Sequence, residues 1–350
     1  MWQIDNRTPF AAERSWVRGR DGTEIWLVAV KASFDITADG KLEVAREQPP
    51  VLRLPLYHGV EGASSIRYEA DLVLTKKTSD VLVVGHAWAP AGTAVVRTDV
   101  GLRVGSLQKV LRVFGDRVWG SFGPSAPEPF QKMPLVYERA YGGVDAKSRM
   151  PDKDWDWRNP VGCGYAVSSD HATGMRLPNI EYPDRLIGSW RDRPPPAGFG
   201  PIASHWQPRA GYAGTYDAHW MATRQPLLAD DLDDRHFQCA PADQQTQEFL
   251  RGGEPVTLLN LHPRGRIHFT LPKLSLGFDT RFDDGSHQLH QHRRLHTVIL
   301  EPDLPRVSLV WHSMLPCHFR VHQLERTIVT LKIDLSTGNR QPDDADLELA

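Results

Sequence analysis

Four histidines lie close together in the last quarter of the chain, at His287, His290, His292 and His296. On an extended strand, His290 and His292 would point to the same face. Neutral imidazoles in that arrangement are suitable ligands for zinc or copper. Arg293 and Arg294 lie beside them, however, and would repel a divalent cation. The alternative is a polar, solvent-facing strand or hairpin arm, and we therefore predict no metal site and no cofactor.

The residues needed for nucleophilic catalysis form no familiar motif in this sequence. There is no GxSxG elbow, and Cys163, Cys239 and Cys317 are few and widely separated. Cys239 has Phe237 and Ala240 close by, which is typical of a buried structural thiol. We therefore predict no catalytic residues and do not expect an enzyme.

Tryptophan is abundant, with eleven in 350 residues, and four fall in the middle of the chain at Trp155, Trp157, Trp190 and Trp206. The faces of exposed tryptophans can stack on sugars or on partner proteins. The alternative for any single tryptophan is the core, because large aromatic side chains are usually buried. Both interpretations stay open from the sequence alone.

Strand patterns dominate the two ends of the sequence. Runs of β-branched and aromatic residues between turn residues indicate strands. The expected strands are Glu24–Ile36, Val81–Ala89, Ala94–Thr98, Lys109–Phe114, Arg117–Phe122, Pro255–Leu261, Arg266–Leu271, Thr297–Glu301, Arg306–Trp311 and Thr327–Ile333. Gly115-Asp116 and Asp283-Asp284-Gly285 are expected as hairpin turns. The best helix signal is short, at Ala242–Arg251, and is followed by two glycines.

The centre of the chain, Pro124–Pro208, is rich in Pro, Gly, Trp and Asp and shows little periodicity. A disordered linker would be poor in aromatic residues, so we expect long ordered loops that pack on the sheets. The predicted fold is mostly β, with antiparallel sheets in sandwich-like layers and few short helices. Residues 1–335 would form one compact unit, with two intimate halves (about 1–123 and 205–335) joined by the loop-rich centre as the alternative, and residues 336–350 would form a polar tail.

Composition narrows the range of partners and compartments. The net charge of -2 argues against a general binder of nucleic acid or anionic membranes. The polar N-terminus has no apolar core of a signal peptide, and no run approaches the length of a membrane span. An odd number of cysteines favours a reducing compartment. We therefore expect a cytoplasmic protein that neither inserts into a membrane nor binds nucleic acid.

Several stretches, in a fixed order along the chain, together resemble one family. They are Pro134–Gly143 (PLVYERAYGG), Arg158–Tyr165 (RNPVGCGY), Pro195–Ile202 (PPAGFGPI), Ala213–Pro226 (AGTYDAHWMATRQP) and Asp231–Gln245 (DLDDRHFQCAPADQQ). This set is similar to the domain-of-unknown-function family encoded beside spike and effector genes in bacterial type VI secretion clusters. The resemblance extends roughly from Trp2 to Ile333. The chain departs from the family pattern at Cys163, Cys239 and His312.

The resemblance implies an adaptor or chaperone without catalytic residues or cofactor. Its partners would be an effector protein with a PAAR-like domain and the VgrG spike onto which the effector is loaded. Aromatic and Arg side chains dominate such interfaces when they are exposed. The expected contact residues are Trp155, Trp157, Arg158, Trp190, Trp206, Arg209, Tyr216, Trp220 and Arg224. The alternative for the arginines is structural, with guanidinium groups tying long loops together.

Two competing functions make different structural predictions. A hydrolase from the same gene cluster would need a deep pocket with converging polar groups and shifted pKa values. A carbohydrate-binding module would need a planar row of exposed tryptophans. An adaptor would instead present exposed apolar surface or open strand edges.

Overall fold

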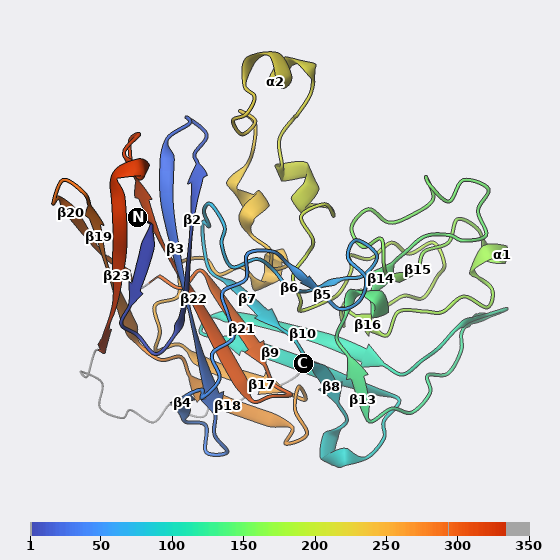
Figure 1. Ribbon diagram of the computed structural model, residues 1–350. Coiled ribbons are helices and arrows are strands. Elements are labelled where there is room, and N and C mark those ends of the chain that lie inside the picture. Colours follow the sequence, from blue (N-terminus) through green and yellow to red (C-terminus); the bar gives the residue numbers. More distant parts are fainter. Residues whose placement is uncertain (1, 293, 334–350) are drawn as a thin grey trace.

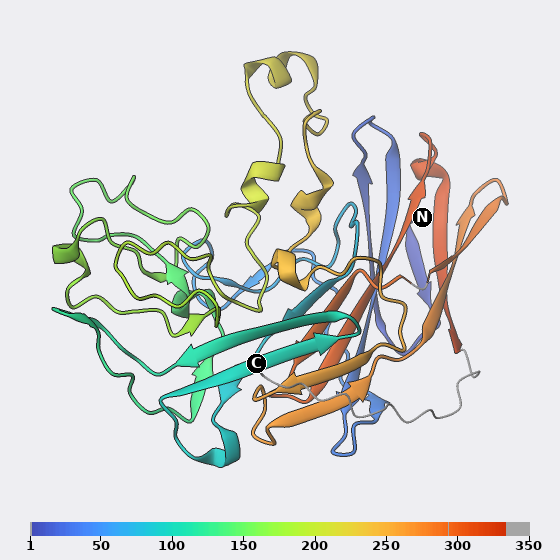
Figure 2. The ribbon, with the colours of Figure 1, turned by 180° about the vertical axis from the view of Figure 1, so that it is seen from behind.

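The computed structural model describes residues 2–292 and 294–333. Strands dominate these residues, as the sequence predicts, and the expectation of a mostly β fold with few short helices is confirmed. In Figures 1 and 2 the large sheets lie to one side and the loop-rich centre to the other. A narrow arm rises between these two parts.

The largest sheet has six strands and is built around β3. Its order is β2-β3-β22-β21-β7, with β4 also paired to β3. The strands are β2 (Ala11–Arg18), β3 (Glu24–Ile36), β4 (Leu42–Val44), β7 (Asp80–Val83), β21 (Thr297–Glu301) and β22 (Arg306–Pro316). β3 is buried on both faces over most of its length, which explains why it is a nearly continuous run of apolar residues.

Two further sheets complete the main body. A four-stranded sheet has the order β1-β23-β19-β20, and a five-stranded sheet has the order β16-β10-β9-β17-β18. The first contains β1 (Gln3–Asn6), β19 (Leu274–Phe282), β20 (His287–His292) and β23 (Leu324–Ile333). The second contains β9 (Arg97–Val104), β10 (Leu107–Phe114), β16 (Ile180–Glu181), β17 (Pro255–Leu259) and β18 (Arg266–Thr270). Most pairs are antiparallel, whereas β1–β23 and β7–β21 are parallel.

Short two-stranded ladders and single helical turns form the rest. The ladders pair β5 (Leu56–Tyr57) with β6 (Ile66–Tyr68), β8 (His86–Trp88) with β13 (Lys132–Pro134), β11 (Trp119–Gly120) with β12 (Gly123–Pro124), and β14 (Tyr141–Gly142) with β15 (Cys163–Gly164). The α-helices are α1 (Ser169–Ala172) and α2 (Ala218–Thr223). The 3₁₀ helices are η1 (Pro90–Gly92), η2 (Tyr137–Arg139), η3 (Arg209–Tyr212), η4 (Asp234–Phe237), η5 (Ala242–Gln244) and η6 (Val321–Gln323).

One apolar core joins the three large sheets. It contains Val28 and Val30 of β3, Leu102 of β9, Val256 of β17 and Phe278 of β19, all nearly inaccessible to solvent. Strands from both ends of the sequence therefore share one interior. Whether the molecule also divides into two halves stays a prediction, and residues 336–350 lie outside the described residues.

Two local predictions are wrong. β10 ends at Phe114 and forms its hairpin with β9, so Gly115-Asp116 is not a hairpin turn, and β11 pairs with β12 instead. The expected helix at Ala242–Arg251 is only the turn η5. The chain leaves the helical path there because Gln244 donates hydrogen bonds to the carbonyls of Val81 (2.7 Å) and Phe199 (2.9 Å).

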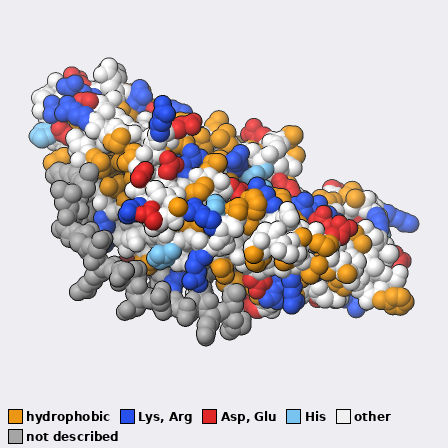
Figure 3. Space-filling model, turned by 90° about the horizontal axis from the view of Figure 1, so that it is seen from below, with side chains coloured by type: hydrophobic (Ala, Val, Ile, Leu, Met, Phe, Trp, Pro, Cys, Tyr) orange, Lys and Arg blue, Asp and Glu red, His pale blue; other side chains and the backbone are white. Residues whose placement is uncertain are grey.

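None of the helices in the described part of the chain has the length and apolar composition that a membrane span requires. On the face seen in Figure 3, side chains of both charge signs are interspersed with hydrophobic ones. That face therefore carries no extended field of a single sign, in keeping with the net charge of -2.

Candidate partner-binding surface

An arm formed by residues 209–238 projects from the body and carries α2 at its tip (Figure 1). α2 begins after Asp217, whose carboxylate accepts a hydrogen bond from the backbone N–H of Trp220 at 2.9 Å. Asp is a favoured residue at this capping position because it satisfies a free N–H of the first turn. The helix ends at Thr223, three residues before Pro226, which lacks the N–H needed to continue it.

Internal contacts hold the tip of the arm in one shape. The rings of Tyr216 and Trp220 meet edge to face, with their centroids 4.8 Å apart. The indole N–H of Trp220 donates to the carbonyl of Leu227 at 2.9 Å. Asp231 accepts two hydrogen bonds from Thr215, one from its backbone N–H and one from its hydroxyl. The arm is therefore an ordered projection.

Arginines anchor the arm to the turn between β2 and β3. Arg224 donates to the carbonyl of Arg20 at 2.7 Å and forms an ion pair with Asp230 at 2.9 Å. Arg20 in turn pairs with Asp234 at 2.7 Å. Arg224 thus fixes the arm on the body, which fits the structural alternative for this residue.

The tip of the arm leaves large apolar side chains in solvent. Met221 is 56% exposed and Tyr216 is 46% exposed. From Thr215 to Leu228 no residue is buried, so this segment contributes little to the apolar core. Long ordered loops that contribute little to the core commonly carry binding or catalytic residues.

A second aromatic feature lies in the loop-rich centre. Trp155 and Trp157 stack on each other, with ring centroids 5.4 Å apart and an angle of 16° between the planes. Trp157 is 58% exposed. The next residue, Arg158, is held by Asp156 through two hydrogen bonds, at 2.9 and 2.5 Å. The two rings are stacked face to face and therefore do not form a flat row.

Two of the expected contact residues are buried, which corrects the sequence interpretation. Trp206 is 2% exposed and packs edge to face on Tyr137, with centroids 5.8 Å apart. Arg209 is 6% exposed and donates to Glu69 and to the carbonyl of Ile202, both at 2.5 Å. Both side chains fix the base of the arm, so neither can contact a partner in this conformation.

The remaining expected residue, Trp190, lies away from the arm. It packs partly on a small core around Trp119 and lines a cavity of about 330 Å³ with it. The structure thus divides the nine expected contact residues among the arm, the Trp155–Trp157 loop, the buried base of the arm and this separate cavity. Sequence reasoning missed Met221 because a single methionine carries no pattern that predicts its exposure.

The histidine cluster does not form a common site in the part that the structure describes. His287 contacts Asp279 at 3.0 Å, whereas His296 is buried with its ring 4.3 Å from that of His312. Among the described residues, no group of three or more His, Cys, Asp or Glu could hold a metal ion. The side chain of His292 lies outside the described residues.

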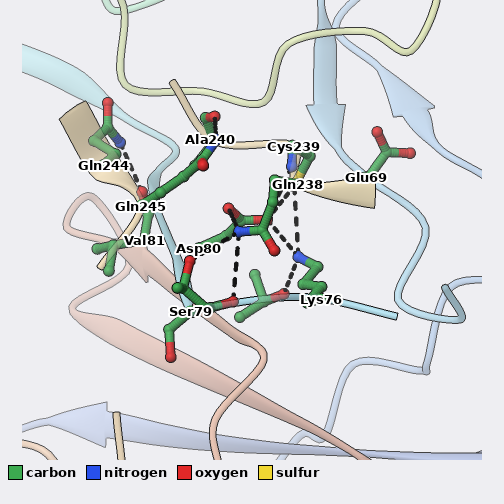
Figure 4. A network of polar contacts seen from close by, with 12 residues as sticks. Glu69, Lys76, Ser79, Asp80, Val81, Gln238, Cys239, Ala240, Gln244 and Gln245 are labelled. Atoms are coloured by element: carbon green, nitrogen blue, oxygen red, sulfur yellow. Dashed lines mark hydrogen bonds and ion pairs between the residues drawn. The ribbon is translucent and has the colours of Figure 1, made fainter. Parts of the chain in front are cut away.

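A buried polar network connects the arm's C-terminal end to the largest sheet (Figure 4). Asp80 accepts from Lys76 at 2.5 Å, from Gln238 at 3.0 Å and from the backbone N–H of Cys239 at 2.9 Å. Burial tends to lower the pKa of Lys76, but attraction to Asp80 outweighs it and the pKa is raised. The Cys239 thiol is buried and contacts Asp80 at 3.3 Å, and burial raises its pKa. The burial expected from its sequence context is confirmed.

The motifs that carry the family resemblance interlock through their backbones. β14 and β15 pair in parallel and bring the glycines of YGG against those of VGCG. A side chain at Gly143 would meet the carbonyl oxygen of Gly162 at 2.3 Å. Asn159 is fully buried and donates to the carbonyls of Tyr137 (2.8 Å) and Tyr141 (3.0 Å). These motifs therefore build the scaffold of the loop-rich centre.

One family model matches most of the chain. The model of a family described as "Uncharacterized protein conserved in bacteria (DUF2169)" matches residues 21–312. The chain belongs to the DUF2169 family. The matched region contains the whole arm and the Trp155–Trp157 pair, so both are features of the DUF2169 region of this chain. Searches of curated proteins and of solved structures find no significant match.

Proposed function

We propose that this protein is a type VI secretion adaptor or chaperone. It would bind an effector, or the PAAR-like part of one, in the cytoplasm and help to load it onto the VgrG spike. The observation that carries the proposal is the arm, an ordered projection with exposed Tyr216 and Met221 at its tip. Aromatic and methionine side chains are enriched where proteins contact one another.

The carbohydrate-binding alternative receives less support from the geometry. A carbohydrate-binding module needs a planar row of exposed tryptophans. Among the described residues, only Trp16 and Trp157 of the eleven tryptophans expose a large share of their surface, 38% and 58%. Trp157 is stacked on Trp155, so its neighbouring ring covers one face. The exposed side chains of the arm tip and of Trp157 are better suited to contacting a partner protein.

The first experiment is co-expression with the effector encoded in the same gene cluster, followed by purification through a tag on one chain and size exclusion. We expect a stoichiometric complex. Substitution of Met221→Asp places a charge at the arm tip and should weaken binding at least about tenfold. Leu304→Asp is a matched control, because Leu304 is similarly exposed, at 55%, but lies in the turn between β21 and β22.

Three outcomes are informative. A complex that Met221→Asp weakens and Leu304→Asp leaves intact supports the proposal and places the interface on the arm. A complex that neither variant affects moves the interface elsewhere on the molecule. Clean separation of the two wild-type proteins, with the effector soluble and stable alone, contradicts the proposal.

A further inference from the structure

A cavity of about 540 Å³ lies at the base of the arm, and we refer to it as the arm-base cavity. Arg158 lines it on the side of the Trp155–Trp157 pair, and Gln207 and Pro208 line it where the chain enters η3 of the arm. The backbone N–H of Gln207 donates to the carbonyl of Trp157 at 2.9 Å and joins the two sides. The cavity therefore lies between the base of the arm and the loop that carries the Trp155–Trp157 pair.

The walls of the arm-base cavity are formed largely by apolar side chains and by tyrosine and proline rings. The side chains that form them include Tyr137, Tyr182, Pro196, Ile202, Pro208 and Ala242. Tyr137 is fixed from behind, because Trp206 packs on its ring and its hydroxyl donates to the carbonyl of Gly200 at 3.3 Å. Proline and fixed tyrosine rings lose little conformational entropy when a ligand binds. The cavity is thus preformed.

The charged groups at the rim balance one another. Arg158 is paired with Asp156, and Asp243 is paired with the buried Lys109 at 2.8 Å. Arg185 lies 3.7 Å from Asp184 on the outer rim. The cavity thus presents no surplus charge that would attract a phosphate, a carboxylate or a metal cation. An uncharged apolar ligand fits it best.

The polar groups beneath the cavity are engaged with one another. Lys109 is fully engaged by the carbonyl of Gly198 (2.6 Å), by Asp243 and by Gln244 (2.8 Å). Tyr182 donates to the other oxygen of Asp243 at 3.0 Å. Among the described residues, the lining contains no Ser, Cys or His, and its carboxylate Asp243 is engaged by Lys109 and Tyr182. These contacts hold the floor of the cavity in place, which suits it to binding.

We propose that the arm-base cavity binds an extended, uncharged segment of the partner polypeptide through proline or aromatic side chains. The proposal rests on the adaptor function and adds to it where the partner is held and by what chemistry. The volume lies within the range of roughly 300–1,000 Å³ for ligand pockets, so it exceeds what one small side chain needs. Grooves lined with aromatic rings recognise proline-rich segments because those segments are already extended.

The proposal is tested by a substitution at the rim that fills the cavity with a larger side chain. Ala242 is exposed and lines the cavity, so Ala242→Trp should block it without disturbing the core. Isothermal titration with the purified effector should show binding weaker by at least about tenfold. Ala38→Trp is the control, since it adds the same ring at an exposed alanine in the turn after β3, outside the cavity. This variant should bind as the wild type does.

A second measurement identifies the bound segment. A photo-crosslinking amino acid in place of Arg185, an exposed long side chain on the outer rim, should capture an effector peptide that carries proline or aromatic residues and no net charge. An array of short uncharged peptides, probed with wild type and with Ala242→Trp, tests the cavity without the effector. Selective retention of proline-containing or aromatic peptides by the wild type is the expected result.

Failure of the two proposals can be told apart. If the effector binds wild type and Ala242→Trp equally, with both folded by circular dichroism, the cavity proposal is wrong and the adaptor function stands. If the effector does not bind the wild type, the adaptor function is wrong. A peptide array that shows no difference between the two proteins, or a crosslink to a charged segment, also overturns the cavity proposal.

Discussion

At the scale of single residues, Lys109 is a buried lysine whose surroundings shift its pKa. Burial lowers its pKa from 10.5 to about 8, although Asp243 opposes the shift. The folded state therefore loses the Lys109 proton at a lower pH than the unfolded chain does. Between these two values the unfolded chain binds more protons, so stability must rise with pH there.

We therefore predict that the wild type gains about 2 kcal/mol of unfolding free energy between pH 7 and pH 10 relative to Lys109→Met. Below pH 7 the two curves should run parallel, because Lys109 is protonated in both states. Urea denaturation at a series of pH values measures the difference. Lys153→Met, which removes an exposed lysine, should follow the wild type. Parallel curves for wild type and Lys109→Met above pH 8 would show that the ammonium is not destabilised by burial.

The sequence identifies the kinds of residue at the candidate surface but not their exposure. Trp206 and Trp220 were both expected to contact a partner, yet Trp206 is buried against Tyr137 and Trp220 lies in α2 at the tip of the arm. Arg209 and Arg224 differ in the same way. The exposure of a side chain depends on which distant segments of the chain pack against it, and the local sequence does not determine those contacts. Cys239 was predictable as a buried thiol because its neighbours are apolar.

At the scale of elements, strands with a continuous apolar run were predictable. Glu24–Ile36 and Thr297–Glu301 agree with β3 and β21 to the residue. β19 was missed because Gly277 and the charged Asp279 and Arg281 interrupt its apolar pattern. α2 was missed because six residues are too few for a helical period to show. Its stability comes from the cap at Asp217 and the Trp220 contacts.

The interlocked glycine motifs give a prediction at this scale. A methyl group at Gly162 would lie 2.4 Å from the side-chain nitrogen of Asn159 and 2.8 Å from the carbonyl oxygen of Ala140. Moving Asn159 would break two buried hydrogen bonds, so Gly162→Ala should lower the free energy of unfolding by about 3 kcal/mol. Urea or thermal unfolding measures the loss.

Gly188→Ala is the matched control, because the nearest atom to an added methyl group there is 4.0 Å away. It should change the unfolding free energy by less than about 0.5 kcal/mol. Equal stability of the two variants would mean that the loop-rich centre adjusts without cost, and that the YGG and VGCG motifs owe their presence to something other than this packing.

At the scale of the whole molecule, the sheets depend on contacts between distant parts of the chain. β3 pairs with β22 from Ile25↔Pro316 to Asp35↔Arg306, and β7 pairs with β21. β9 lies between β10 and β17. The mostly β class followed from composition and pattern, but these pairings did not, because nothing in a local run of residues says which distant strand will be its neighbour.

This connectivity predicts that the chain cannot be divided at the loop-rich centre. Residues 1–204 would expose β3, whose long partner β22 lies in the other fragment, and residues 205–350 would leave β17 and β21 without β9 and β7. Each fragment would present unpaired strand edges and half of the shared core, so we expect neither to show near-ultraviolet circular dichroism or a cooperative unfolding transition when expressed alone. Co-expression should restore both signals, because the missing strands are then supplied in trans. A fragment that folds by itself would mean that its sheet is stable without the pairing described above, and that the two-half interpretation describes independent domains.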